Sequence, residues 1–283
     1  MSGNRPERFE KAARSGADAI ILDLEDSVPP ADKAMARQAI AAQWQDLLAL
    51  NVPLVVRINA ADSGAWPDDL AMIGKLQGLA AVMVPKAESP EIMSEVGALL
   101  GGVSVVPIVE SAAGFHAVRG LAAAPGVLRL AVGHIDFMAD VGMICDEQES
   151  ELVPLRFAVA MATRSAQLAP AIDGVTVQTT DERRLREDTL RALRFGFGAK
   201  LCIHPRQVPV VHEALAPTES ELQWARGVIA ADEAARGRAV QLDGRMVDLP
   251  VVLQAQRTLA RAAGQGSAKS LSLIHISEPT RRS

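Results

Sequence analysis

The stretch Val103-Ser-Val-Val-Pro-Ile-Val-Glu110 is a short apolar run that ends in an acidic residue, and a second run, at 127–136, ends in Asp136. Short runs rich in valine and isoleucine indicate strands that are buried on both faces. A carboxylate at the C-terminal end of such a strand lies where α/β barrels carry their chemistry. We therefore expect Glu110 and Asp136 to share one Mg²⁺ ion, with water and substrate oxygens as its other ligands. The alternative is that these two acids only cap the next helices.

The same alternation of apolar runs and amphipathic segments extends along most of the chain. Seven runs indicate strands, at 19–24, 54–58, 81–84, 103–109, 127–132, 172–177 and 199–203. Strands that alternate with helices predict a parallel sheet covered by helices, here an α/β fold of the TIM (β/α)8 barrel type. Because a closed barrel of this type has eight strands, we expect this one to lack its first strand.

The pattern changes after residue 206, which we take as the end of a barrel domain at 1–206. Helices are predicted at 207–215 and 219–236, and a hairpin turns at Asp243-Gly244 before a last helix. Residues 207–263 are therefore expected to form a C-terminal helical lid or oligomerisation arm. Residues 264–283 begin with a Gly-Gln-Gly-Ser linker and fit no part of the α/β pattern, so we expect a non-native or disordered tail.

Composition and charge exclude several classes of protein. A net charge of −5 gives no basic surface for nucleic acid, and no apolar stretch reaches the length of a membrane span. The polar N-terminal residues contain no signal-peptide core. Cys145 and Cys202 have no CxxC partner, so we expect reduced thiols in a cytoplasmic protein that binds neither nucleic acid nor membrane.

Arg57 places a charge inside the apolar run at 54–58, which is costly unless the charge is paired. Its planar guanidinium could clamp a substrate carboxylate or stabilise an enolate oxygen, or it could form a buried salt bridge with Asp23 or Glu25. We favour the functional role. Asp23, Glu25 and Asp26 cannot all be buried without partners, so one of them could support a metal through water or hold Arg57.

Three further residues have both a functional and a structural interpretation. Lys86 could contact an anionic substrate, but it could equally pair with Glu88 or Glu110. His204 ends the last run; it could carry a proton or donate a hydrogen bond to a ligand, but we prefer the role of fixing the loop that follows it. Asp248 lies just before the last helix, where an N-cap is the simplest role.

A set of motifs in fixed order resembles a known family. The motifs are Gly3-Asn-Arg-Pro-Glu-Arg-Phe, Ile21-Leu-Asp-Leu-Glu-Asp, Val56-Arg-Ile-Asn, Val82-Met-Val-Pro-Lys-Ala-Glu, Glu110, Gly133-His-Ile-Asp-Phe and Ile203-His-Pro-Arg-Gln. Over residues 3–263 the chain resembles the citrate lyase β-subunit-like CoA ester lyases of the HpcH/HpaI aldolase superfamily. The resemblance implies a TIM barrel that uses Mg²⁺ and assembles as a homotrimer or a dimer of trimers.

The resemblance also implies a role for individual residues. In the family, the residues matching Glu110 and Asp136 bind the metal, with Glu110 beside the substrate. The residue matching Arg57 binds the acyl oxygens and stabilises the enolate. A lid motif matching Gly244-Arg-Met-Val-Asp-Leu-Pro250 brings the residue matching Asp248 into a neighbouring subunit's site as an acid/base group.

The implied function is a Mg²⁺-dependent carbon–carbon lyase that cleaves or forms a 3-hydroxyacyl-CoA, such as citramalyl-, malyl- or citryl-CoA, through an enolate. Its substrates would be a CoA thioester and a small keto acid. The alternatives are a class II pyruvate aldolase or an acyl-CoA thioesterase of the same superfamily, or a catalytically impaired homologue.

Overall fold

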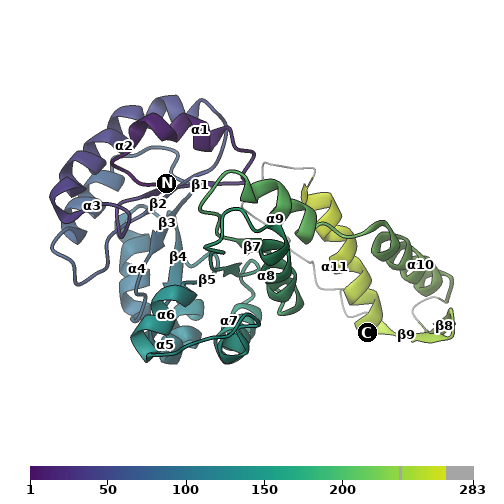
Figure 1. Ribbon diagram of the computed structural model, residues 1–283. Coiled ribbons are helices and arrows are strands. Elements are labelled where there is room, and N and C mark those ends of the chain that lie inside the picture. The colour runs from purple at the N-terminus through teal and green to yellow at the C-terminus, as the bar shows by residue number, and fades with distance from the viewer. Residues whose placement is uncertain (236–237, 266–283) are drawn as a thin grey trace. The chain divides into compact units, whose positions relative to one another are not determined.

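The computed structural model describes residues 1–235 and 238–265. The chain divides into two compact units, Met1–Val211 and His212–Ser283. A parallel sheet with helices around it forms the first unit, and two helices with a hairpin form the core of the second (Figure 1). The tail predicted at 264–283 lies, from residue 266 onward, outside the described residues.

The first unit contains one curled sheet whose strands are all parallel and follow one another in chain order, which confirms the predicted α/β barrel class (Figure 1). The strands are β1 (Ile20–Asp23), β2 (Leu54–Arg57), β3 (Ala81–Val84), β4 (Ser104–Val109), β5 (Ala131–Val132), β6 (Ile172–Asp173) and β7 (Ala199–Lys200). Among the described residues, β1 and β7 are the two edges of this sheet.

Residues 1–3 lie beside β1, at the edge where the sequence predicted no strand. Ser2 forms an isolated parallel bridge with Asp23. The Asp23 N–H donates to Met1 O at 2.8 Å, and the Gly3 N–H donates to Asp23 O at 2.8 Å. These residues therefore satisfy the outer hydrogen-bonding groups at the end of β1.

Helices alternate with the strands along the chain, beginning with α1 before β1, and cover the outer side of the sheet. They are α1 (Phe9–Ala13), α2 (Lys33–Leu48), α3 (Trp66–Ile73), α4 (Pro90–Leu99), α5 (Ala112–Ala123), α6 (His134–Val141), α7 (Val153–Ser165), α8 (Glu182–Arg194) and α9 (Gln207–Leu215). Ser89 and Ser111 cap α4 and α5, because their hydroxyls accept from the Ile92 and Gly114 N–H groups.

Alternate residues of the strands face two separate cores, which decides where the polar side chains point. Val56 and Val109 belong to a large cluster that includes helix residues such as Trp44. Val55 and Ile108 belong to a small cluster made only of strand residues and their direct neighbours, so this cluster fills the inside of the curled sheet. The side-chain period of two then turns Asp23, Arg57 and Glu110 toward the inside, because they lie two residues after Ile21, Val55 and Ile108.

The second unit is a small antiparallel hairpin packed on two helices. Its elements are α10 (Glu219–Ala235), β8 (Val240–Leu242), β9 (Arg245–Val247) and α11 (Leu249–Gln265). Asp243 and Gly244 both have positive φ, at 49° and 76°, as the tight hairpin turn requires. Val228, Val247 and Ala255 are buried where the helices and the hairpin meet.

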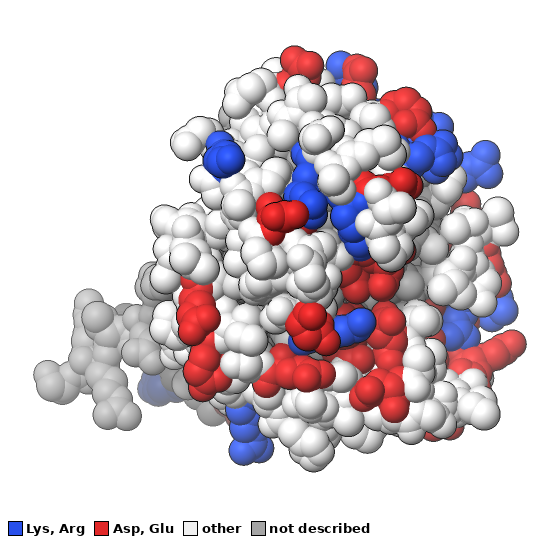
Figure 2. Space-filling model, turned by 90° about the vertical axis from the view of Figure 1, so that its left-hand side faces the viewer, with Lys and Arg blue, Asp and Glu red and all other residues white. Residues whose placement is uncertain are grey.

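The charged side chains on the surface include many acidic ones, as the net charge of −5 indicates. Acidic and basic side chains are interspersed on the face that Figure 2 shows, and several acidic ones lie in its recessed centre. No helix in the described part of the chain is long and apolar enough to cross a membrane. Cys145 and Cys202 are both free thiols.

Candidate active site

Arg57 lies at the C-terminal end of β2 and joins two carboxylates of the β1 end. Asp23 is its direct neighbour in the register of β1 and β2. Arg57 donates from Nε to Asp23 Oδ1 at 2.6 Å and from Nη2 to Asp23 Oδ2 at 2.7 Å. Its Nη1 lies 2.9 Å from Glu25 Oε2. Arg57 therefore forms the buried salt bridge that we gave as the alternative to a functional role. This salt bridge holds the guanidinium at the carboxyl edge of the sheet.

The three charges respond differently to burial. Burial would raise the pKa of Asp23, but the hydrogen bonds and charge of Arg57 outweigh it, so the Asp23 pKa lies below its ordinary value. Burial raises the pKa of Glu25 to about 7, because the charge of Arg57 offsets only part of the effect. Burial would lower the pKa of Arg57, and Asp23 and Glu25 together reverse this. Arg57 is thus always charged.

Glu110 follows β4 and is buried, with 4% of its surface exposed. Its Oε1 accepts a hydrogen bond from the backbone N–H of Lys86 at 2.7 Å. Burial raises the Glu110 pKa to about 8; the Lys86 hydrogen bond lowers it, and the nearby charges of Asp136 and Glu25 raise it further. Glu110 is therefore a desolvated carboxylate with other carboxylates nearby.

Asp136 does not end a strand, contrary to the prediction. β5 ends at Val132, and Asp136 lies in the first turn of α6, half-buried. The apolar run does not continue as a strand to Asp136 because the chain turns at Gly133. No side chain fits at this position, since an added Cβ would overlap Glu110 Oε2. This close approach brings the start of α6 against Glu110.

The donor set at this edge fits a hard divalent cation. In the described parts of the chain, no three His, Cys, Asp or Glu side chains gather as a metal site. Glu110 and Asp136 offer only carboxylate oxygens, which Mg²⁺ prefers, and Mg²⁺ commonly takes one or two carboxylates with water and substrate oxygens. Burial is the main cause of the raised Glu110 pKa, and a cation there would offset both burial and the added repulsion from Asp136 and Glu25.

The remaining predicted residues lie around or apart from this cluster. Asp26 and Lys86 are exposed, and Lys86 reaches Glu110 through its backbone rather than its ammonium group. His204 is exposed, and its Nδ1 accepts from the Arg206 N–H at 3.1 Å, as expected for a residue that fixes its loop. Asp248 belongs to the second unit, where it is exposed between β9 and α11.

A second charged cluster was not predicted. On the outer side of the sheet, Asp173 of β6 accepts from Arg156 Nε at 3.1 Å and lies 3.3 Å from Lys200 Nζ. Glu149, in the loop before α7, accepts from Arg156 Nη2 at 2.7 Å, and Arg184 and Arg191 of α8 also donate to it. Asp173 and Lys200 interrupt apolar runs in the same way as Arg57, which is the signal that could have indicated them.

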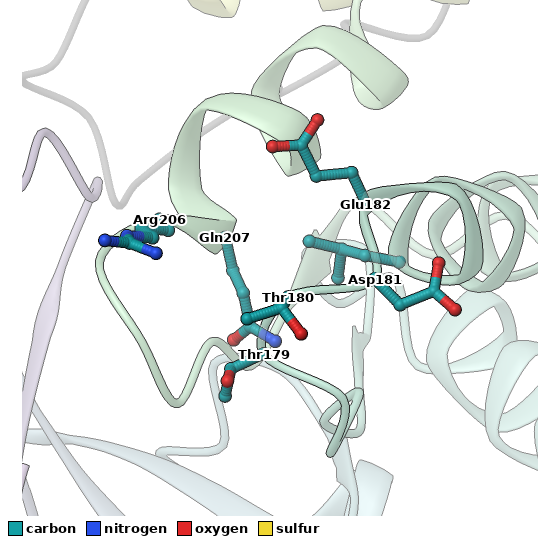
Figure 3. Close-up of a pocket in the computed structure, with 7 residues that line it drawn as sticks. Thr179, Thr180, Asp181, Glu182, Arg206 and Gln207 are labelled. Atoms are coloured by element: carbon teal, nitrogen blue, oxygen red, sulfur yellow. The ribbon is translucent and has the colours of Figure 1, made fainter.

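Two hollows in the first unit lie away from the carboxylate cluster. The smaller, about 90 Å³, lies between the loop before α8 and the start of α9, where Figure 3 shows Gln207 reaching toward Thr179 and Thr180. Gln207 is buried and already bonded to Thr176 O and to two loop N–H groups. The larger, about 550 Å³, is an open depression beside the start of α2. None of the predicted site residues lines either hollow.

A parallel curled sheet with carboxylates and an arginine at its carboxyl edge defines an enzyme of the α/β barrel class. The family model for HpcH/HpaI aldolase/citrate lyase matches residues 1–205. The chain therefore belongs to the HpcH/HpaI aldolase/citrate lyase family, a family of lyases.

Relatives match nearly the whole chain. A citrate lyase subunit beta-like protein of Mycobacterium tuberculosis is 36% identical over 94% of this chain and 94% of its own length. An L-malyl-CoA/beta-methylmalyl-CoA lyase of Cereibacter sphaeroides is 33% identical over 92% of each. The crystal structure of CitE from Mycobacterium tuberculosis with magnesium, acetoacetate and coenzyme A has a TM-score of 0.79 and 34% identity, covering 93% of this chain and 96% of that one.

Proposed function

We propose that this enzyme is a Mg²⁺-dependent CoA ester lyase, which cleaves or forms the carbon–carbon bond of a 3-hydroxyacyl-CoA such as citramalyl-, malyl- or citryl-CoA. The observation that carries the proposal is the juxtaposition of Glu110 and Asp136 beside the charged pair of Arg57 and Asp23. Relatives named for malyl-CoA cleavage and a neighbour with bound magnesium and coenzyme A support it.

Each residue has a defined role in this reaction. Glu110 and Asp136 hold the metal, which when bound supplies Lewis acidity and a template for the substrate oxygens. Arg57, oriented by Asp23, stabilises the negative charge that develops on the acyl oxygen as the bond breaks. Glu25, Asp26 and Lys86 surround these groups without binding the metal directly.

Protonation of the enolate carbon is assigned to Asp248 of a neighbouring copy of the chain. Asp248 is exposed on the hairpin side of the second unit, and its exposed neighbours Met246 and Leu249 offer apolar surface to cover a substrate. A carboxyl group so placed can act as a general acid once closure excludes water.

The assembly required by this arrangement is a homo-oligomer, which we propose to be a trimer or a dimer of trimers. The surface that favours self-association is a stripe on α7 formed by Val153, Phe157 and Met161, which recur at every fourth residue and are 41%, 56% and 46% exposed. An exposed apolar stripe on an amphipathic helix is typical of a contact surface.

The test is to replace the metal ligand on α6 and compare it with a matched acid on the same helix. Asp136→Asn should remove Mg²⁺ binding in calorimetry and lower the rate of CoA ester cleavage by at least about 10²-fold. Asp140→Asn is the control, because Asp140 accepts from the Ala112 N–H and is not one of the proposed metal ligands. Unchanged Mg²⁺ affinity in Asp136→Asn would overturn the assignment.

The products of the same assay separate the alternative reactions. Cleavage of the substrate carbon chain yields a keto acid and an acyl-CoA, whereas a thioesterase would release free CoA. A class II pyruvate aldolase would act on substrates without CoA, and an impaired homologue would bind Mg²⁺ without turnover.

A further inference from the structure

We propose that His134 is a positioning residue: its buried ring fixes the first turn of α6 and thereby sets Asp136 at the distance from Glu110 that one metal ion requires. The inference rests on the proposed function, in which these two carboxylates bind the metal. His134 itself does not touch the metal or the substrate in this account.

The start of α6 is held from the inside of the sheet by close backbone approach. The helix begins at His134 without a side-chain cap, since its N-cap residue is Gly133. An added Cβ at Gly133 would overlap both Oε2 and Cβ of Glu110. The backbone just before Asp136 therefore rests against the Glu110 side chain, so a small rotation of α6 changes the separation of the two carboxylates.

The same turn is held from the other side by the imidazole. His134 is 4% exposed, and its Nδ1 is buried with no hydrogen-bond partner among the described residues. The ring lies directly against Gly174, where an added Cβ would overlap Nδ1 and Cε1. The imidazole is thus positioned by packing against the end of β6 rather than by a hydrogen bond at Nδ1.

The surface that receives the ring is itself rigid. Lys200 Nζ donates to Gly174 O at 2.7 Å and lies 3.3 Å from Asp173 Oδ2. Asp173 is fully buried and accepts from Arg156 Nε at 3.1 Å. These buried charged contacts fix Gly174. The outer cluster, which the reaction does not use, therefore supports the wall against which His134 locates α6.

The experiment measures metal binding directly, by Mg²⁺ calorimetry and by Mn²⁺ titration followed by electron paramagnetic resonance. His134→Ala should weaken binding of both ions by about tenfold, the lower end of the 10–100-fold range seen when supporting residues around a metal are removed. Thr163→Ala is the control, because Thr163 is also buried with an unpartnered polar atom but lies on α7. It should leave metal affinity unchanged.

Gly174→Ala displaces the ring without removing any charge, and it tests the same contact from the other side. Gly174→Ala alone should weaken Mg²⁺ binding. Its effect should be smaller in the His134→Ala background, because the ring is then gone and the remaining close neighbour of the added Cβ is Val132 O, at 3.0 Å. Should His134→Ala fail to fold, His134→Gln takes its place in the pair.

Wild-type affinity for Mg²⁺ in folded His134→Ala, or strictly additive effects in the double variant, would overturn the positioning role while leaving the proposed function intact. Absence of Mg²⁺ binding in the wild-type protein would instead overturn the proposed function, and the inference with it.

Discussion

Lys86 contributes to the site through its backbone. It has a φ of 45°, a left-handed conformation that costs an L-residue roughly 1–2 kcal/mol. In this conformation its N–H donates to Glu110 Oε1 at 2.7 Å. Strained residues of this kind cluster at functional sites, where the strain fixes a group that would otherwise turn away.

Lys86→Gly should leave Mg²⁺ affinity within about twofold of wild type, because glycine keeps the amide and accepts the same φ without strain. The free energy of unfolding should be unchanged or up to about 1 kcal/mol higher. Calorimetry and urea denaturation measure the two quantities. Asn51→Gly is the control, since Asn51 also has positive φ, at 55°, but lies outside the site.

A large rise in KM for the CoA ester in Lys86→Gly, with Mg²⁺ affinity preserved, would contradict this account. That result would show that the ammonium group itself binds the anionic substrate.

At the scale of elements, sequence periodicity predicted the helices better than the later strands. The helices predicted at 207–215 and 219–236 correspond to α9 (Gln207–Leu215) and α10 (Glu219–Ala235). The runs at 127–132, 172–177 and 199–203 gave strands of only two residues each. Burial explains part of this apolar character, since Leu130 is fully buried beside β5 without belonging to a strand. It does not explain Val177 and Ile203, which are each 53% exposed.

Sequence periodicity could not predict that Asp136 lies in a helix rather than at a strand end, for a related reason. The run at 127–136 contains the end of a strand, a turn at Gly133 and the first turn of α6, all buried or half-buried apart from Ile135. Only the close approach of Gly133 to Glu110 separates these elements, and such an approach depends on residues distant in sequence. By contrast, the runs at 54–58 and 103–109 did form strands, β2 and β4, and Arg57 and Glu110 lie at their C-terminal ends.

Glu149 joins the loop after α6 to two helices, α7 and α8, and this tie should depend on pH. Burial would raise its pKa, but its hydrogen bond with Arg156 and the charges of Arg156 and Arg191 outweigh burial and lower the pKa below 4.5. The folded protein then binds this proton less tightly than the unfolded chain. The stabilisation is therefore complete above about pH 4.5 and is lost as the pH falls through the lowered pKa.

Glu149→Gln should lower the free energy of unfolding by about 2 kcal/mol at pH 7. Three arginines lose one charged partner, although Arg156 keeps Asp173, and Arg184 and Arg191 keep Asp188. The difference from wild type should narrow at pH 4. Urea denaturation at pH 7, 5 and 4 measures both effects. The control Glu187→Gln removes only an exposed pair with Arg183 and should change stability by less than about 0.5 kcal/mol. If the stability difference between wild type and Glu149→Gln stayed constant from pH 7 to pH 4, the ionised Glu149 carboxylate would not be its cause.

At the scale of the whole molecule, the α7 stripe predicts how copies associate. Phe157→Glu places a charge at its centre, where Phe157 is 56% exposed, and should reduce the assembly to monomers in light scattering coupled to size exclusion. CoA ester turnover should fall with it, because Asp248 would no longer reach a neighbouring site, while Mg²⁺ affinity stays unchanged.

Leu99→Glu is the matched control, since Leu99 is 69% exposed on α4 without an apolar stripe of this spacing. An oligomer that survives Phe157→Glu would place the contact elsewhere on the molecule.

The two cores of the sheet also determine which changes in chain length the enzyme can tolerate. Val109 faces the helices and Glu110 the inside, so a one-residue insertion within β4 would exchange their directions. The carboxylate would then be driven into the apolar layer under the helices, and a valine would replace it beside Arg57. The loops between strands and helices can therefore change in length without disturbing the site. Within a strand that carries a site residue, a change of one residue in length reverses the direction of that residue, so it is as damaging as replacing the residue itself.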